Sequence, residues 1–134
     1  MPSIDAIEGM GQRNATKMRK AGIRTTEALL KRAASRKGRR DLAAITELDE
    51  KQILIWVNRA DLMRCKGIGS EYSDLLEAAG VDTVKELRRR NAISLTAKMI
   101  TLNEQKRLVR RLPTEAMVGR WVEHAKTLEP VVTH

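Results

Sequence analysis

The chain has 134 residues, enough for one compact domain or for two small units that share a core. Its 26 Lys and Arg against 17 Asp and Glu give a formal charge of +9, which favours a polyanionic partner, either nucleic acid or an anionic membrane surface. A single Cys excludes an internal disulfide, and two His residues offer no metal-ligand cluster. No apolar run approaches the ~20 residues needed to span a bilayer, and the first residues lack a signal-peptide layout, so we expect a cytoplasmic protein.

The sequence predicts an all-α fold without β-strands, because alternating β-branched and aromatic runs are missing. The first half is expected to form four helices, over residues 4–8, 12–21, 26–34 and 50–66. The expected capping side chains are Ser3, Thr25 or Thr26, and Asp49. A turn at Gly9-Met10-Gly11 separates the first two helices, and Gly22 ends the second. Residues 35–40 are predicted to form an exposed basic loop.

The second half is predicted to follow the same pattern. One helix is expected between Gly69 and Gly80, and the next from a cap at Asp82-Thr83 to Arg90. The next helix is expected from Ser94 to Arg111, and Asn103 is the place where this helix could break. The last helix is expected to start at Pro113-Thr114 and to end at Pro130.

Two segments match when the second is moved back by 58 positions, which places residues 62–69 on residues 4–11. Equivalent positions farther along are Ala15 and Ser73, Met18 and Leu76, Gly22 and Gly80, Thr25 and Thr83, and Leu29 and Leu87. A second correspondence with an offset of 65 pairs Trp56 with Trp121, which implies seven extra residues in the second copy. We therefore predict two tandem repeats, over residues 1–60 and 61–134, packed as one compact helical unit or as two small subdomains.

Each copy contains a turn in which an apolar residue lies between two glycines. The apolar residue is expected to fill the gap between two helices, and the glycines to adopt backbone angles that a side chain would forbid. The small residue that follows, Ala15 or Ser73, would let the helices approach closely. Such a turn leaves backbone N–H groups free at the start of a helix, where a phosphate oxygen could bind.

Both segments resemble the helix-hairpin-helix motifs of DNA repair, recombination and replication proteins, a superfamily with a SAM-domain-like fold. The whole chain is also similar to a bacterial family catalogued as a domain of unknown function. The stretches that carry this resemblance are residues 7–11, 21–30, 60–64 and 77–87. In DNA-binding members of the superfamily, the hairpin backbone and a nearby basic residue hold phosphates that flank the minor groove.

This resemblance implies nucleic-acid-binding residues at both hairpins. The first hairpin and the helix after it offer Gly9, Met10, Gly11, Gln12, Arg13 and Lys17. The second offers Gly67, Ile68, Gly69 and Ser70. Its helix departs from the pattern, because Glu71, Asp74 and Glu77 would repel a phosphate. The formal charge is +2 over residues 4–29 and −2 over residues 62–87, so we favour the first hairpin for binding and leave packing or a protein partner open for the second.

For several other basic and apolar residues, a purely structural interpretation stands beside a binding role. The run Arg36, Lys37, Arg39 and Arg40 is either a solvated connection or an additional phosphate contact beside the first hairpin. The arginines at 88–90 suit a helix C-terminus. Trp56 and Trp121 are interpreted as core residues rather than base-stacking platforms, and Cys65, at the position of Ile7, as a small buried residue.

The sequence contains no nucleophile beside a base, no paired carboxylates in a defined cleft and no nucleotide-binding glycine loop. We therefore expect no enzymatic activity, no cofactor, no bound metal and no small-molecule substrate. The expected function is sequence-independent binding of the duplex DNA backbone. The alternative is a helical protein–protein interaction module or scaffold without a nucleic-acid role.

Overall fold

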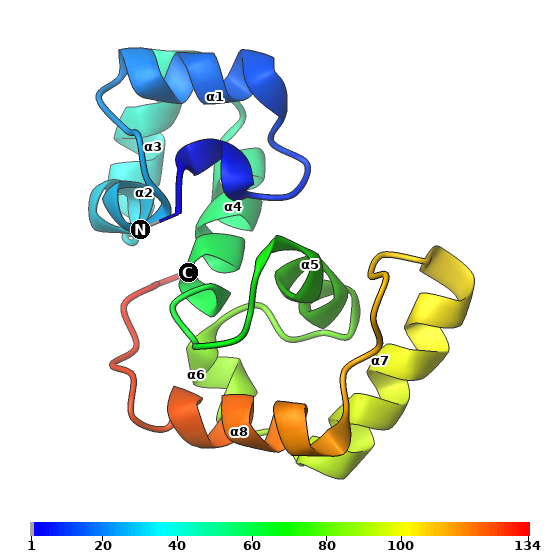
Figure 1. Ribbon diagram of the computed structural model, residues 1–134. Coiled ribbons are helices and arrows are strands. Elements are labelled where there is room, and N and C mark those ends of the chain that lie inside the picture. Colours follow the sequence, from blue (N-terminus) through cyan, green and yellow to red (C-terminus); the bar gives the residue numbers. More distant parts are fainter. Residues whose placement is uncertain (1) are drawn as a thin grey trace. The chain divides into compact units, whose positions relative to one another are not determined.

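The computed structural model describes residues 2–134, and within them the fold is all-α, as predicted (Figure 1). A short 3-10 helix, η1 (Ile4–Ala6), is followed by α1 (Gly11–Lys20), α2 (Thr26–Ala33), α3 (Arg36–Thr46), α4 (Glu50–Leu62), α5 (Ser70–Ala78), α6 (Val84–Leu87), α7 (Ala92–Lys106) and α8 (Glu115–Ala125). No β-strand forms in the described part of the chain, where Ser3 and Thr25 make one isolated β-bridge.

These helices belong to two compact units. Unit 1 comprises residues 2–61 together with the last four residues, Val131–His134, and unit 2 comprises Leu62–Pro130. The last four residues join unit 1 through a hydrogen bond from the Thr133 amide to the Ala34 carbonyl, 3.0 Å long.

Equivalent residues of the two units form the same turn. α1 and α5 both end in a glycine with positive φ, +87° at Gly22 and +91° at Gly80. After each glycine, the next amide bonds back to the last turn of the helix, from Ile23 to Met18 and from Val81 to Leu76, both at 2.9 Å. This pattern is a Schellman motif, in which a left-handed residue satisfies the last carbonyls of a helix. The sequence prediction that Gly22 and Gly80 end these helices is confirmed.

Each unit buries its own aliphatic core. In unit 1 the fully buried side chains include Ile4, Met18, Leu29, Leu42 and Trp56. In unit 2 one cluster joins α5, α6, α7 and α8, and its members include Leu75, Leu87, Met99, Val118 and Trp121. The prediction that both tryptophans are core residues is confirmed, because their exposed fractions are 1% and 2%. Cys65 is also buried, as predicted.

Several predicted helix boundaries are wrong. The helix predicted over residues 4–8 behind a Ser3 cap is a three-residue 3-10 helix, Ile4–Ala6, without a side-chain cap. The helix predicted to continue to Lys66 ends at Leu62, and the one predicted to reach Arg90 ends at Leu87, without a cap from the Thr83 side chain. α7 begins at Ala92 behind a cap from Asn91, where Ser94 was expected.

The end of α7 differs most from the prediction. Instead of continuing to Arg111, the helix stops at Lys106, and Arg107 adopts a left-handed conformation with φ +50°. Asn103 holds the chain that follows, because its side chain accepts a hydrogen bond from the Val109 amide (2.9 Å) and donates one to the Val109 carbonyl (3.2 Å). Residues 107–114 therefore form a loop between α7 and α8, whereas only residues 47–49 separate α3 from α4.

Candidate nucleic-acid interface

The first hairpin, Gly9-Met10-Gly11, joins η1 to α1. Gly9 and Gly11 have positive φ, +81° and +76°, and both are exposed, while Met10 between them is buried. The predicted roles of these three residues in the turn are confirmed. No side chain caps the start of α1, and Gly11, Gln12 and Arg13 in its first turn are exposed.

The polar side chains after the first hairpin are exposed or partly exposed. Gln12 and Arg13 are exposed in the first turn of α1, and Lys17 is half-buried one turn farther along. The first turn of α1 contains no acidic residue. A positive side chain and a helix N-terminus therefore act in the same direction on an approaching anion.

A long-range contact braces this hairpin. The Arg59 guanidinium on α4 donates a short hydrogen bond to the Glu8 carbonyl and lies 3.2 Å from the position that a Cβ would take on Gly9. The equivalent residues of unit 2 are Lys66 and His124, and there the Lys66 amide donates to Nδ1 of His124 at 2.9 Å. The sequence repeat does not predict these contacts. The equivalent positions hold two different residue types, Arg59 and His124, and the first donates a hydrogen bond whereas the second accepts one.

The second hairpin, Gly67-Ile68-Gly69, is bent in a different way at its third residue. Gly67 has φ +96°, and a Cβ there would lie 2.9 Å from Nε1 of Trp121, so both the backbone angle and the space require glycine. Ile68 is buried, as predicted. At Gly69 the prediction of a glycine-only conformation is wrong, because φ is −97° and a Cβ would meet nothing within 4 Å.

Gly69 is instead the N-cap residue of α5, with extended backbone angles and no capping side chain. Ser70 and Glu71 occupy the first two positions of the helix. Serine, threonine and asparagine side chains cap α2, α3, α7 and α8, whereas both helices that follow hairpins begin without such a cap.

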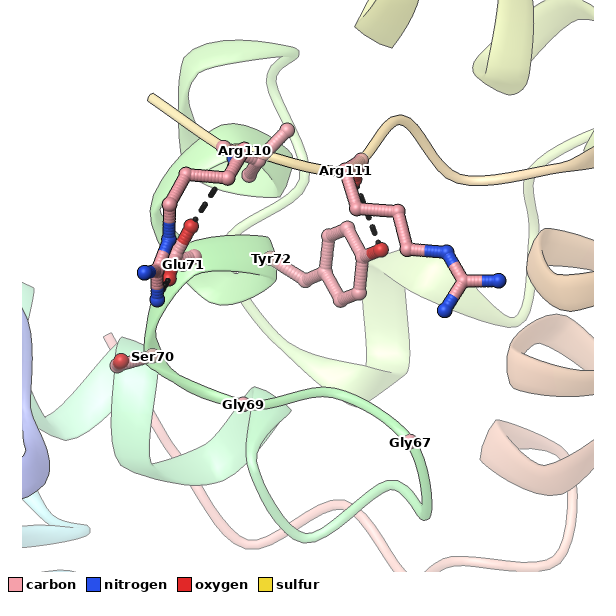
Figure 2. Close-up of a pocket in the computed structure, with 8 residues that line it drawn as sticks. Gly67, Gly69, Ser70, Glu71, Tyr72, Arg110 and Arg111 are labelled. Carbon is pink, nitrogen blue, oxygen red and sulfur yellow. Dashed lines mark hydrogen bonds and ion pairs between the residues drawn. The ribbon is translucent and has the colours of Figure 1, made fainter. Parts of the chain in front are cut away.

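Glu71, at the second hairpin, forms an ion pair with Arg110. Its carboxylate accepts two hydrogen bonds from Arg110 in the 107–114 loop, one from the amide at 3.2 Å and one from the guanidinium at 3.0 Å (Figure 2). These bonds to Arg110 lower the pKa of the Glu71 carboxyl. Charges counted along residues 62–87 omit Arg110 and Arg111, which the loop brings to this hairpin from 39 or more positions away.

The basic run at 36–40 is not the predicted loop. Ser35 caps α3 by accepting a hydrogen bond from the Gly38 amide, and Arg36, Lys37, Arg39 and Arg40 all lie on the helix. A Cβ on Gly38 would come within 2.2 Å of the Arg32 carbonyl, so α3 starts in close contact with the end of α2. The local composition, one glycine and four cations, predicts a loop. The Ser35 cap and the close packing of Gly38 on Arg32 stabilise a helix there instead.

Arg39 cannot serve as a phosphate contact. It is 4% exposed, and its guanidinium donates to the carbonyls of Ala33 (3.1 Å), Ala34 (2.8 Å) and Thr133 (2.6 Å). Burial of the guanidinium lowers the pKa of Arg39. Arg39 therefore holds the end of α2 and residues 131–134 in place, while Arg36, Lys37 and Arg40 are exposed.

The end of α2, just before the α3 cations, contacts the C-terminal end of α1. Arg32, in the last turn of α2, reaches the Ala21 carbonyl at the C-terminal end of α1. The first hairpin lies at the other end of α1, about 15 Å along a ten-residue helix. Arg90, equivalent to Arg32, makes the corresponding bond to the Gly80 carbonyl at 3.1 Å, which supports the helix-end interpretation of that arginine.

No group of three or more His, Cys, Asp or Glu side chains in residues 2–134 is arranged to hold a metal ion. No helix in the same range is long and apolar enough to cross a membrane.

The geometry defines an all-α protein of two compact units, each with a glycine hairpin followed by a helix that no side chain caps. A model of the family described as a domain of unknown function (DUF4332) matches residues 8–128, so the chain belongs to this family. No curated protein and no solved structure matches the chain.

Proposed function

We propose that this chain is a non-enzymatic protein that binds the backbone of duplex DNA without sequence preference, and that its two glycine hairpins are helix-hairpin-helix motifs. The proposal rests on one observation, the exposed backbone at the two hairpins. Each exposes glycine backbone at the start of a helix that no side chain caps. A phosphate oxygen can accept hydrogen bonds from such amides, and the helix dipole favours its charge.

The charge of the chain supports the same function. The formal charge of +9 provides a long-range attraction to a polyanion. At the first hairpin Arg13 is exposed, and neither Arg13 nor Lys17 is engaged in an ion pair among residues 2–134. Phosphate contacts of this type fix position on a duplex and read no base, so the expected binding is independent of sequence.

The first experiment is a fluorescence-anisotropy titration of labelled duplex DNA at several salt concentrations. Micromolar binding is expected, with an affinity that falls linearly with salt on a log–log plot and a slope of about −0.9 for each phosphate contacted. Absence of binding at low salt would contradict the proposal and favour the alternative function, a protein–protein interaction module.

A charge-reversed variant tests the first hairpin. Replacing Arg13→Glu together with Lys17→Glu should lower the salt slope by about 2 and weaken binding at least about tenfold at low salt. Arg24→Glu together with Lys31→Glu is the matched control, since these exposed cations of unit 1 give the same change in net charge away from the hairpin. Equal loss of affinity in the two double variants would mean that net charge alone, and not the hairpin, drives binding.

A further inference from the structure

The second hairpin borders a groove that the 107–114 loop completes. Eight residues line this second-hairpin groove: Gly67, Gly69, Ser70, Glu71, Tyr72, Val109, Arg110 and Arg111 (Figure 2). Its volume is about 590 Å³, within the range of ~300–1,000 Å³ typical of ligand-binding clefts. Two of the lining side chains are arginines, and both come from a loop that has no counterpart of similar length in unit 1.

Arg110 and Arg111 differ in what they contact. The guanidinium of Arg110 pairs with the Glu71 carboxylate, although its side chain remains 92% exposed. Arg111 is exposed and its guanidinium makes no hydrogen bond or ion pair within residues 2–134. In Figure 2 the two side chains lie on either side of Tyr72, with the hairpin glycines below them.

Tyr72 fixes the loop at the edge of the groove. Its hydroxyl donates a 2.9 Å hydrogen bond to the Arg111 carbonyl, and its ring packs on Trp121 with the centroids 5.0 Å apart. Because Trp121 is buried in the core of unit 2, this chain of contacts positions the Arg111 backbone firmly. The two arginines are thus presented from an anchored segment, which reduces the entropy lost on binding.

A second hollow also has Gly67 in its lining. It is lined by Lys66, Gly67, Met117, Arg120, Trp121 and His124. Lys66 and Arg120 are exposed there. Each of the two hollows that meet at Gly67 therefore has two cations in its lining, Arg110 and Arg111 in one and Lys66 and Arg120 in the other.

We propose that the second-hairpin groove is a second phosphate-binding site, in which Arg110 and Arg111 bind successive phosphates of a nucleic-acid backbone. This inference rests on the nucleic-acid function proposed above. Guanidinium groups suit phosphate oxygens, since they offer planar paired donors. Glu71 acts as an internal anion that holds Arg110 at the hairpin until a phosphate shares it.

Substitutions in the full-length chain test this site. The double variant Arg110→Ala/Arg111→Ala should lower the salt slope for labelled duplex DNA by about 2 and weaken binding about tenfold at low salt. The matched control is Lys85→Ala/Arg89→Ala, which removes two positive charges from exposed side chains of the same unit that do not line the groove, and it should change affinity less than about twofold. Circular dichroism and thermal unfolding should give the same helicity for all variants.

Glu71→Gln provides a second, opposite test. The amide oxygen can still accept from the Arg110 backbone, but the negative charge at the hairpin is gone. Binding of duplex DNA should therefore become tighter, by about threefold to tenfold, with one more unit of salt slope. If Glu71 only stabilised the loop, this variant would bind more weakly than the wild type.

The outcomes separate this inference from the proposed function. Wild-type binding with an Arg110/Arg111 double variant that behaves like Lys85→Ala/Arg89→Ala would overturn the groove and leave the function standing. No wild-type binding would overturn both. If polyglutamate shifts the amide NMR signals of Ser70 and Arg111 while duplex DNA leaves them unchanged, the groove takes an acidic protein segment and the proposal is wrong.

Discussion

At the scale of single residues, Gly69 differs from the other hairpin glycines because it does not need to be glycine. Gly9, Gly11 and Gly67 have φ between +76° and +96°, which L side chains rarely adopt, whereas Gly69 has φ −97°. A side chain at Gly69 would enter open space at the N-cap of α5. Serine is among the preferred residues at such a position, so its absence costs some stability and keeps the helix amides available.

Gly69→Ser should therefore change stability and binding in opposite directions. The serine hydroxyl would cap α5 and raise the free energy of unfolding by about 0.5–1 kcal/mol. The same hydroxyl would compete with a phosphate for the amides of the first turn and weaken duplex binding by about threefold to tenfold. Urea unfolding and anisotropy titration measure the two effects.

Gly119→Ala is the control for this prediction. Gly119 lies inside α8, and a Cβ there would make an ordinary contact with Ala92 at 3.9 Å. Alanine should stabilise the helix by about 0.5–1 kcal/mol without touching either hairpin. If Gly119→Ala also weakened DNA binding, added stability rather than helix capping would explain the effect of Gly69→Ser.

Cys65 gives a prediction for alkaline pH. Burial raises the pKa of its thiol to about 11, and the thiol lies 3.3 Å from the Trp121 carbonyl. The folded-state pKa is above the unfolded value, so this contribution to stability is complete below the ordinary pKa of 9.0 and is lost as the pH rises towards 11. The free energy of unfolding should therefore fall more steeply over this interval in the wild type than in Cys65→Ala. Parallel pH profiles of the two proteins would contradict the prediction.

At the scale of elements, α3 illustrates how a basic segment becomes structural. Its charged run contains one buried arginine, Arg39, whose guanidinium joins α2 to residues 131–134. Local composition does not predict this role, because one of the three carbonyl acceptors belongs to Thr133, 94 positions away. The charge pattern of a sequence identifies its cations, but it does not show which of them are buried and hydrogen-bonded in the folded protein.

Arg39→Met should destabilise unit 1 by about 2–3 kcal/mol, since three hydrogen bonds from a charged donor are lost in a buried site. DNA affinity of the folded variant should stay close to that of the wild type. Arg40→Met is the matched control, because its exposed side chain should change stability by less than about 0.5 kcal/mol. Thermal and urea unfolding measure the difference, and equal stability of the two variants would show that Arg39 does not hold the segment.

At the scale of the whole molecule, the predictions that hold are those that depend on local signals. Glycine after a periodic segment ends α1 and α5, and hydroxyl residues before one begin α2 and α8. The predictions that fail depend on side-chain contacts that composition does not show: the helical state of residues 36–40, the end of α7 and the charge at the second hairpin. In each case a specific contact decides, such as the Asn103 bonds to Val109 or the Arg110 pair with Glu71.

The two hairpins together lead to a prediction about sequence preference. Neither hairpin presents a side chain that is arranged to read base edges, since the apolar residue at each tip is buried in its own unit. Binding through amides and arginines should then give affinities that differ by less than about threefold among equal-length duplexes of A·T-rich, G·C-rich and mixed sequence. Competition anisotropy with unlabelled duplexes measures these ratios. A preferred sequence bound more than about tenfold tighter, with the preference kept at high salt, would point to direct base contacts worth about 1–3 kcal/mol each. Such a result would replace the backbone mechanism at one or both hairpins with direct readout.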